Sequence, residues 1–390
     1  MKVVCGLFTL LFIVYVCSSC EKSQLDIKTE YDYQAFNELL SNANDEGLFI
    51  ENIKQRKNGT IEILFSNNQH LIIRGDEIQF ITIGLNGMWY RNDSCTSYLT
   101  EEQTIYDVLE PPHENPGDLY AISEDYEDWT FHFVECPSII IRKVIYSKDF
   151  DSVILSINHR GHSALAPENT LPAFRLSRLK GFRYAEADVR FTADNVPVLL
   201  HDESINRTSN GVGKIKELTF SQVRQYDFGS WKSNDFKETK IPSLDEFLIL
   251  CKNTGLHPVL ELKVGTKDQI NQVMSKVEEL GLGDETIYIS FSSTILSCVL
   301  ENKPLATVAF ITSKIDENTF KTIHSLKAVK PVIIDANDYK EESIVRCREQ
   351  NIPLWVWVIN SEETILSLSS YISAVTSDNI HAGRLKSGYK

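Results

Sequence analysis

EADVRFTADNVPVLLHD, Glu186 to Asp202, is the stretch that decides the fold of the C-terminal part of the chain. It contains two apolar runs that each resemble a strand, with only a few residues between them. Two parallel strands need a crossover of about a dozen residues, so the second run, VPVLLHD, can only return antiparallel to the first. We therefore predict a hairpin whose return arm brings His201 back to the strand ends.

Outward from this hairpin, apolar runs alternate with helix-like segments from Ser152 to Lys390, as strands and helices do in βα units. Eight such runs in a segment of this size suit a (β/α)₈ barrel, which typically has about 250 residues. The predicted fold class is α/β, a TIM barrel over residues 152–390 with a small insertion at about 203–241. The eight runs are VILSINH, RYAEADV, PVLELK, TIYISF, TVAFIT, PVIIDA, LWVWVIN and ISAVTS.

Residues 32–148 show a different pattern. A short helical stretch around Phe36 precedes period-two runs such as TIEILF, HLIIRG and IQFITIG, which are broken by Asn58-Gly59 and Asn86-Gly87. Alternating apolar residues with Asn-Gly turns are the strongest short-range hairpin signal. We expect a small, β-rich, antiparallel accessory domain before the barrel.

The first twenty residues have the features of a secretory signal: Lys2, an apolar stretch, and small residues before Cys20. Ser18-Ser19-Cys20 resembles a bacterial lipobox, in which the cysteine is lipidated; the alternative is an ordinary cleaved signal. Residues 21–31 are predicted to be a polar tether. We expect an exported lipoprotein, in the periplasm or on the cell surface, that meets the membrane only through its lipid anchor.

Charge and cysteine content exclude some classes of partner. The formal net charge of −15 argues against nucleic acid, because no basic stripe is present to displace counterions from phosphates. The five cysteines beyond residue 20 show no CxxC spacing, so neither a zinc site nor a dense disulfide framework is indicated. Cys95 and Cys136 could form a disulfide in an oxidising compartment, and the spacing leaves this open.

Ionisable residues stand at the ends of the first three predicted strands and of the return arm. The C-terminal strand ends of such a barrel face one mouth, where active sites are built. The strand period of two puts Glu186 and Asp188 on one face, and likewise Glu261 and Lys263. The residues at these ends are His159 and Arg160, Glu186 and Asp188, His201, and Glu261 and Lys263.

Three carboxylates that converge at one mouth would repel each other unless a cation joins them. Oxygen ligands without cysteine favour Ca²⁺ or Mg²⁺ over zinc. A lone Glu-x-Asp pair is usually a solvated strand end, and a lone histidine is usually structural. Their joint placement at consecutive strand ends, inside otherwise apolar runs, favours a site with one divalent cation.

The segment with these residues resembles the glycerophosphodiester phosphodiesterase family, whose superfamily also contains phosphatidylinositol-specific phospholipases C and spider-venom sphingomyelinases D. The likeness spans nearly all of residues 153–380, and the Arg-Thr-Ser-Asn-Gly run between His201 and Pro242 favours this family over the phospholipases C. TSDN, Thr376 to Asn379, departs from the usual Thr-Asp-x-Pro. The matching stretches are HRGHSALAPENTLPAF, EADVRFTADNVPVLLHD, INRTSNGVGKIKELTFSQV, GSWKSNDFKETKIPSLDEFL, ELK, SF and WVIN.

The resemblance also implies a role for each matching residue. Glu168 is expected to orient Arg160 or a histidine, and Trp357 to line the mouth near the glycerol; a buried barrel position is the alternative for Trp357. The resemblance implies an acid–base pair, His159 and His201. It implies three metal ligands, Glu186, Asp188 and Glu261, and two phosphate contacts, Arg160 and Lys263.

The implied reaction is metal-dependent hydrolysis of a small glycerophosphodiester to an alcohol and sn-glycerol 3-phosphate, through a cyclic phosphate. A second hypothesis keeps the chemistry but makes the substrate a lysophospholipid or a polymeric glycerophosphate such as a teichoic acid. A third makes the protein a non-catalytic surface adhesin with a degenerate barrel. The complete set of histidines and carboxylates argues against the third.

Overall fold

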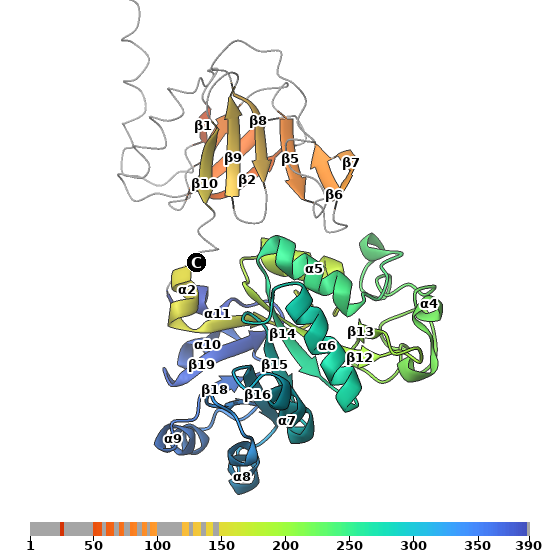
Figure 1. Ribbon diagram of the computed structural model, residues 1–390. Helices are drawn as coiled ribbons and strands as arrows, with labels where there is room; N and C mark the ends of the chain where they lie inside the picture. Colours follow the sequence, from red (N-terminus) through yellow and green to blue (C-terminus); the bar gives the residue numbers. More distant parts are fainter. Residues whose placement is uncertain are drawn as a thin grey trace, which may run out of the picture. The chain divides into compact units, whose positions relative to one another are not determined.

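The structure is a computed structural model that describes residues 148–387 without a gap and the N-terminal region in segments (Figure 1). The chain divides into two compact units, residues 1–77 and 78–390. The predicted signal and lipobox, the helical stretch near Phe36 and Cys136 lie outside the described residues. The N-terminal segments described are 24–26, 50–56, 60–65, 70–73, 79–83, 88–91, 94–99, 119–124, 128–133 and 138–142.

The first unit contains a four-stranded sheet in the order β1-β4-β3-β2. The strands that flank the Asn58-Gly59 signal, β2 and β3, pair antiparallel as predicted, and β4 continues the antiparallel pattern. β1 lies within the predicted tether and pairs in parallel with β4. The strands are β1 (Gln24–Asp26), β2 (Ile50–Gln55), β3 (Ile61–Phe65) and β4 (His70–Ile73).

A six-stranded sheet follows in the order β10-β9-β8-β5-β6-β7. β5 and β6, on either side of Asn86-Gly87, form the predicted antiparallel pair. The contact between β5 and β8 is parallel, so this region is β-rich as expected but not purely antiparallel. The strands are β5 (Gln79–Ile83), β6 (Met88–Arg91), β7 (Ser94–Leu99), β8 (Leu119–Glu124), β9 (Asp128–Phe133) and β10 (Ile139–Arg142).

Eight parallel strands close into a barrel in the C-terminal part of the chain, which confirms the predicted TIM barrel. Closure occurs where β11 pairs with both β12 and β19. β13 (Pro197–Leu199) runs antiparallel to β12, so the predicted hairpin is also confirmed. The barrel strands are β11 (Leu155–Asn158), β12 (Tyr184–Phe191), β14 (His257–Leu262), β15 (Ile287–Ser290), β16 (Thr307–Thr312), β17 (Ile333–Ala336), β18 (Leu354–Val356) and β19 (Ile372–Ser377).

Helices connect the strands, and local capping signals fix where several of them begin. The Ser243 side chain caps α5 by accepting a hydrogen bond from the Glu246 backbone N–H, and the Glu246 carboxylate accepts one from the Ser243 backbone N–H, which completes a capping box. Thr266 and Gln269 do the same for α6. The helices of the barrel unit are α2 (Lys148–Val153), α3 (Leu171–Leu179), α4 (Phe220–Val223), α5 (Leu244–Thr254), α6 (Lys267–Glu279), α7 (Ser293–Asn302), α8 (Glu317–Ser325), α9 (Glu341–Glu349), α10 (Glu362–Ser367) and α11 (Ala382–Lys386).

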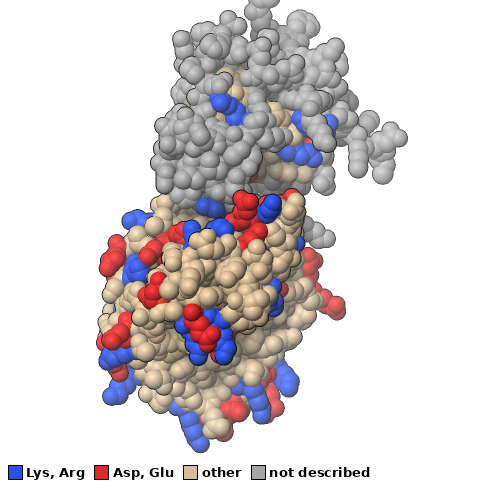
Figure 2. All heavy atoms as spheres, turned by 90° about the vertical axis from the view of Figure 1, so that its right-hand side faces the viewer, with Lys and Arg blue, Asp and Glu red and all other residues tan. Residues whose placement is uncertain are grey.

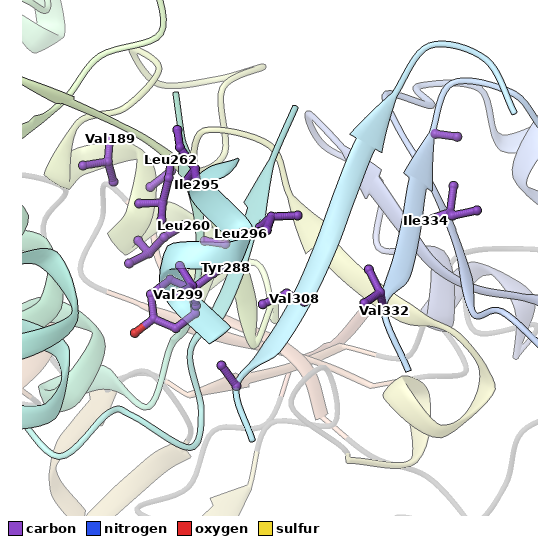
Figure 3. Packing of buried hydrophobic residues seen from close by; sticks show 14 of the residues in the cluster. Val189, Leu260, Leu262, Tyr288, Ile295, Leu296, Val299, Val308, Val332 and Ile334 are labelled. Carbon is purple, nitrogen blue, oxygen red and sulfur yellow. The ribbon is translucent and has the colours of Figure 1, made fainter. Parts of the chain in front are cut away.

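Alternation along the strands separates two buried layers. Leu260 of β14 and Tyr288 of β15 point outward and join Leu296 and Val299 of α7 in the large cluster between strands and helices (Figure 3). Their neighbours along the strands, such as Val259, belong to a second cluster in the barrel interior. The position after Val259 in this inward series is Glu261, so an apolar interior changes to a charged one toward the C-terminal strand ends.

The predicted insertion forms a small subdomain with its own core. Ile205, Ile215 and Val223 pack with Val198 and Leu200 of the hairpin arm. Because this core extends the return arm, it fixes the position of the residues that follow the arm at the barrel mouth. Its short 3₁₀ helices are η3 (Ile215–Glu217) and η4 (Asn234–Phe236).

The surface of the barrel unit carries charges of both signs. Figure 2 shows Lys and Arg interspersed with Asp and Glu, with wide uncharged areas between them. Among the described residues, none of the helices has the length and apolar character needed to cross a membrane.

Candidate active site

Three buried carboxylates meet inside the C-terminal end of the barrel. Glu186 and Asp188 come from β12 and Glu261 from β14, and one oxygen of each lies within 4.8 Å of the others. The convergence follows from the register, because the parallel pairing of the two strands places Asp188 opposite Glu261. The structure therefore brings together the three residues predicted as metal ligands.

Two basic side chains, those of Lys263 and Arg160, lie against these carboxylates. Lys263 Nζ is 2.7 Å from Glu261 Oε1 and 3.1 Å from Asp188 Oδ1, and Arg160 Nε is 3.2 Å from Asp188 Oδ2. Burial, reinforced by Asp188, raises the pKa of Glu261 to about 7. Burial would also raise the pKa of Asp188, but Lys263 and Arg160 hold it below its usual range. The two basic residues thus offset part of the negative charge.

Glu186 is the least satisfied of the three carboxylates. Its Oε2 accepts a hydrogen bond from the Arg160 backbone N–H at 3.0 Å, while its buried Oε1 has no hydrogen-bond partner among the described residues. Burial and the two neighbouring carboxylates raise the pKa of Glu186 well above its usual range. A buried, unpartnered carboxylate oxygen in an all-oxygen donor set fits a hard divalent cation.

Each predicted catalytic histidine is held by an aspartate. His159 Nδ1 lies 2.7 Å from Asp378 Oδ1, and His201 Nδ1 lies 2.7 Å from Asp202 Oδ1. A carboxylate at Nδ1 fixes that nitrogen as the proton carrier and leaves Nε2 for other chemistry. Burial lowers the pKa of His201, while the charge of Asp188 opposes this effect.

The two aspartates stay ionised over the physiological range. Hydrogen bonds from Arg207 and His201 lower the pKa of Asp202 to about 2, against a smaller opposing effect of burial. Burial opposes the shift at Asp378 too, yet the hydrogen bonds from His159, Asn360 and Ser163 lower its pKa to about 2. Neither aspartate was among the predicted site residues.

Glu168 connects the first loop of the barrel with the insertion. It accepts a hydrogen bond from Arg160 Nη1 at 2.9 Å, and its role in orienting Arg160 stays a prediction. It also accepts hydrogen bonds from Arg207 at 2.7 and 2.8 Å, and Arg207 Nε donates to Asp202 Oδ2 at 2.7 Å. Arg207 therefore links Glu168, the partner of Arg160, to Asp202, the partner of His201. It was not among the predicted site residues.

Asn169 is another site residue that the sequence analysis missed. Its backbone is in the left-handed region, with φ 55°, and its side chain faces β12. Asn169 Nδ2 donates to Asp188 Oδ2 at 2.7 Å, and the Asp188 backbone N–H donates to Asn169 Oδ1 at 3.1 Å. This two-way contact fixes the Asp188 carboxylate.

Trp357 lies just beyond β18 and is partly buried. Its Nε1 donates to the Asp335 backbone carbonyl at 3.1 Å, and its ring meets Phe291 edge-on at a centroid distance of 6.1 Å. Trp357 also packs against the interior cluster, so it forms a wall of the barrel interior at its C-terminal end. Contact between Trp357 and a substrate stays a prediction.

The sequence positions of Asp202 and Asp378 indicate their roles. Asp202 directly follows His201, and Asp378 comes one residue after the last strand. A carboxylate next to a strand-end histidine, or at another strand end, is a candidate partner for that histidine. Arg207 has no comparable signal, because its contacts depend on the path of the insertion.

Comparisons with known proteins identify a family that the barrel matches. A model of the Glycerophosphoryl diester phosphodiesterase family matches residues 159–382, more than half of the chain. Glycerophosphodiester phosphodiesterase 1 of Homo sapiens is 38% identical over 135 residues, which cover 34% of this chain and 40% of that protein. The Bacillus subtilis glycerophosphodiester phosphodiesterase is 28% identical over 232 residues, which cover 54% of this chain and 78% of that protein. The chain thus spans only two fifths of the human relative.

Solved structures show the same fold. A putative glycerophosphoryl diester phosphodiesterase from Silicibacter pomeroyi aligns with a TM-score of 0.54 and 20% identity over 60% of this chain and 94% of that chain. An Oleispira antarctica phosphodiesterase, solved in complex with the product sn-glycerol-3-phosphate, aligns with a TM-score of 0.53 and 24% identity over 61% of this chain and 98% of that chain. At this identity the likeness shows the barrel alone.

Proposed function

The chain belongs to the glycerophosphoryl diester phosphodiesterase family, and from that premise we propose that it hydrolyses small glycerophosphodiesters to an alcohol and sn-glycerol 3-phosphate. The observation that carries the proposal is the placement of His159 and His201, each held by an aspartate, at the same barrel mouth as the buried carboxylate cluster. A phosphodiester needs one proton removed and one delivered, next to charges that balance its phosphoryl oxygens.

Glu186, Asp188 and Glu261 would hold one divalent cation, Ca²⁺ or Mg²⁺, because their oxygens converge and Glu186 Oε1 has no partner in the described part of the chain. When bound, such an ion supplies Lewis-acid stabilisation of the phosphoryl oxygens. Arg160 and Lys263 flank the same carboxylates and are placed to offset negative charge on the phosphate as it develops. Glu168 fixes the Arg160 guanidinium in that position.

The histidines carry the two proton transfers. In the first step the glycerol 2-hydroxyl oxygen bonds to phosphorus while the bond from phosphorus to the alcohol oxygen breaks. One imidazole accepts the hydroxyl proton and the other gives a proton to the leaving oxygen, which produces a cyclic phosphate. In the second step water adds to phosphorus and gives a proton to the imidazole that protonated the alcohol. The bond from phosphorus to O2 breaks, and the other imidazole returns the hydroxyl proton to O2, which yields glycerol 3-phosphate.

Asp378 and Asp202 position these imidazoles. Each accepts a hydrogen bond from Nδ1–H at 2.7 Å, so Nε2 is the nitrogen that faces the reacting oxygens. An ionised aspartate also stabilises the imidazolium that forms after proton uptake. Both histidines are thereby available in either role, as the two-step route requires.

Release of glycerol 3-phosphate tests the proposal. Protein without residues 1–20 is incubated with glycerophosphocholine, with EDTA, and with Ca²⁺ or Mg²⁺ restored. We expect metal-dependent release that His159→Ala reduces by at least 100-fold. His324→Ala, which removes an exposed histidine of α8, serves as the matched control and should keep full activity.

Other outcomes separate the alternative hypotheses. One outcome is metal-dependent hydrolysis of lysophosphatidylcholine or of a polymeric glycerophosphate while glycerophosphocholine stays intact. This outcome would support the second hypothesis, in which the substrate is a lipid or a polymer. A folded protein that takes up the metal and hydrolyses none of these substrates would support the non-catalytic adhesin instead.

Export and lipid anchoring form a separate part of the proposal. The apolar leader and the Ser18-Ser19-Cys20 pattern support a lipoprotein in the periplasm or on the cell surface. In cells, we expect the protein to sediment with membranes and Cys20→Ala to release it into the soluble fraction. Equal membrane association of both proteins would contradict anchoring at Cys20.

A further inference from the structure

Asp335 is a buried carboxyl group that the proposed mechanism does not use. It lies on β17, where its register neighbours are Ile311 of β16 and Trp355 of β18. Both neighbours belong to the interior cluster, so the Asp335 side chain points into the barrel as well. Asp335 is only 3% exposed. It therefore places a carboxyl group between two apolar neighbours on this side of the barrel interior.

One oxygen of the Asp335 carboxyl has no hydrogen-bond partner in the part of the chain that the structure describes. Its Oδ1 is buried and has no hydrogen bond among the described residues, and the bond from Trp357 Nε1 goes to the backbone carbonyl. An unpaired buried acceptor costs free energy, so native proteins rarely keep one without a function. Burial, together with the charge of Glu261, raises the pKa of Asp335 to about 7. The influence of Glu261 shows that Asp335 lies near the carboxylate cluster.

A glycerol moiety attached to a phosphate at the carboxylate cluster would reach the surroundings of Asp335. If the proposed function holds, the phosphate lies beside Glu261, and the glycerol attached to it extends along the interior wall that Trp357 forms. The glycerol 2-hydroxyl is the nucleophile, so the terminal hydroxyl remains and needs an acceptor. Asp335 lies on that wall, with its backbone bonded to Trp357 and its carboxyl oxygen unpartnered.

We propose that Asp335 is a specificity-determining residue whose carboxyl oxygen accepts a hydrogen bond from the free terminal hydroxyl of the substrate glycerol. The inference rests on the proposed function and extends it, because it assigns recognition of the polyol to a residue outside the acid–base and carboxylate sets. It also explains why a carboxyl group is kept between two apolar neighbours.

A pair of substrates that differ by one hydroxyl tests this assignment. Glycerophosphocholine is compared with 2-hydroxypropyl phosphocholine, the 1-phosphocholine ester of 1,2-propanediol, which keeps the attacking 2-hydroxyl and has a methyl group in place of the terminal hydroxymethyl group. We expect the wild-type protein to prefer the glycerol substrate by about 10- to 100-fold in kcat/KM. Asp335→Leu should bring this ratio close to one, mainly by slowing the glycerol substrate.

The ratio of the two kcat/KM values does not depend on how much of a variant is folded, because both rates come from the same preparation. Asp335→Asn keeps the size and one acceptor oxygen and should retain an intermediate ratio. Tyr288→Phe is the matched control. It removes the Tyr288 hydroxyl on the outer face of β15, which is also buried and has no hydrogen-bond partner among the residues described, and it should leave the ratio unchanged.

The outcomes separate this inference from the proposed function. A wild-type ratio that persists in Asp335→Leu would overturn the role of Asp335 while the proposed function stands. Failure of the metal-loaded wild type to hydrolyse either substrate overturns the proposed function and the inference with it. A collapse of the ratio in Asp335→Leu but not in Tyr288→Phe supports both.

Discussion

His159 Nδ1 and Asp378 Oδ1 lie 2.7 Å apart although the two residues are 219 positions apart in the chain. The first and last strands of the barrel bring them together, because β11 and β19 pair in parallel with Asn158 opposite Ser377. Asp378 is fixed in turn by hydrogen bonds from Ser163 Oγ at 3.0 Å and from Asn360 Nδ2 at 2.6 Å. The closure of the barrel thus positions His159.

Asp378→Asn is expected to lower kcat by about 100-fold with little change in KM. The amide has the size of the carboxylate but no charge to stabilise an imidazolium, and it can turn its NH₂ group toward Nδ1. Steady-state kinetics on glycerophosphocholine measure the effect. Ser163→Ala, which removes one of the hydrogen bonds to Asp378, should cost less than tenfold. A wild-type kcat in Asp378→Asn would show that His159 needs no carboxylate.

Binding of a divalent cation should stabilise the protein through the carboxylate cluster. Ligand at about 100 times its Kd adds about 2.7 kcal/mol to the free energy of unfolding, so Ca²⁺ or Mg²⁺ should raise Tm by several degrees. Glu186→Gln should abolish the increase, because it removes one charge and the unpartnered oxygen. Thermal melts with and without EDTA measure this.

Asp245→Asn provides the control for the metal experiment. Asp245 pairs with Lys276 on the surface of the barrel, away from the three ligands, at 2.6 Å. The variant should show the same metal-dependent rise in Tm as the wild type. A rise that survives in Glu186→Gln would show that the ion binds elsewhere.

Local pattern was sufficient to predict the barrel and its carboxylates. The eight apolar runs, and the short loop between β12 and β13, determine the strand count without any knowledge of distant contacts. The strand period of two then placed Glu186, Asp188 and Glu261 on inward positions, where they meet. These features depend on spacing of a few residues, which sequence shows directly.

Features that depend on distant segments were harder to predict. Asp378 reaches His159 only because the barrel closes, and Arg207 reaches Glu168 only along the path of the insertion. In the N-terminal region, the parallel β1–β4 and β5–β8 pairs have no turn signal comparable to Asn-Gly. Long-range pairing leaves no periodic mark in the sequence.

Gly161 is expected to be essential for the loop that carries His159 and Arg160. Its φ is +76°, and a Cβ there would lie 2.7 Å from the Ala173 Cβ. Gly161→Ala therefore destabilises the protein in two ways. A left-handed alanine costs about 1–2 kcal/mol of free energy of unfolding, and the added Cβ clashes with α3. Chemical denaturation should show a loss of stability clearly above that range, with reduced kcat.

Gly281→Ala separates the two effects, because Gly281 has the same φ of +76° and no atom within 4 Å of the added Cβ. The free energy of unfolding of this control should fall only by about 1–2 kcal/mol, the cost of a left-handed alanine, and its activity should be unchanged. Equal losses in both alanine variants would mean that the contact with Ala173 is relieved at no cost.

His162 is expected to weaken the fold as pH falls from about 6.5 to 4. Burial lowers its pKa from 6.5 to about 4, so in that range the unfolded chain binds a proton that the folded chain does not. Stability therefore decreases as pH decreases. The full shift corresponds to at most about 3 kcal/mol in the free energy of unfolding.

His162→Phe should remove this dependence while it keeps the edge-on contact with Phe182. Urea unfolding at pH 7 and pH 4.5 gives the free energy of unfolding, and the variant should lose less of it than the wild type between the two values. Groups such as Glu261, whose pKa burial raises to about 7, titrate in the same range but contribute equally to both proteins. His324→Gln, at an exposed position, should behave like the wild type. Parallel pH curves for the wild type and His162→Phe would mean that His162 is protonated in the folded protein.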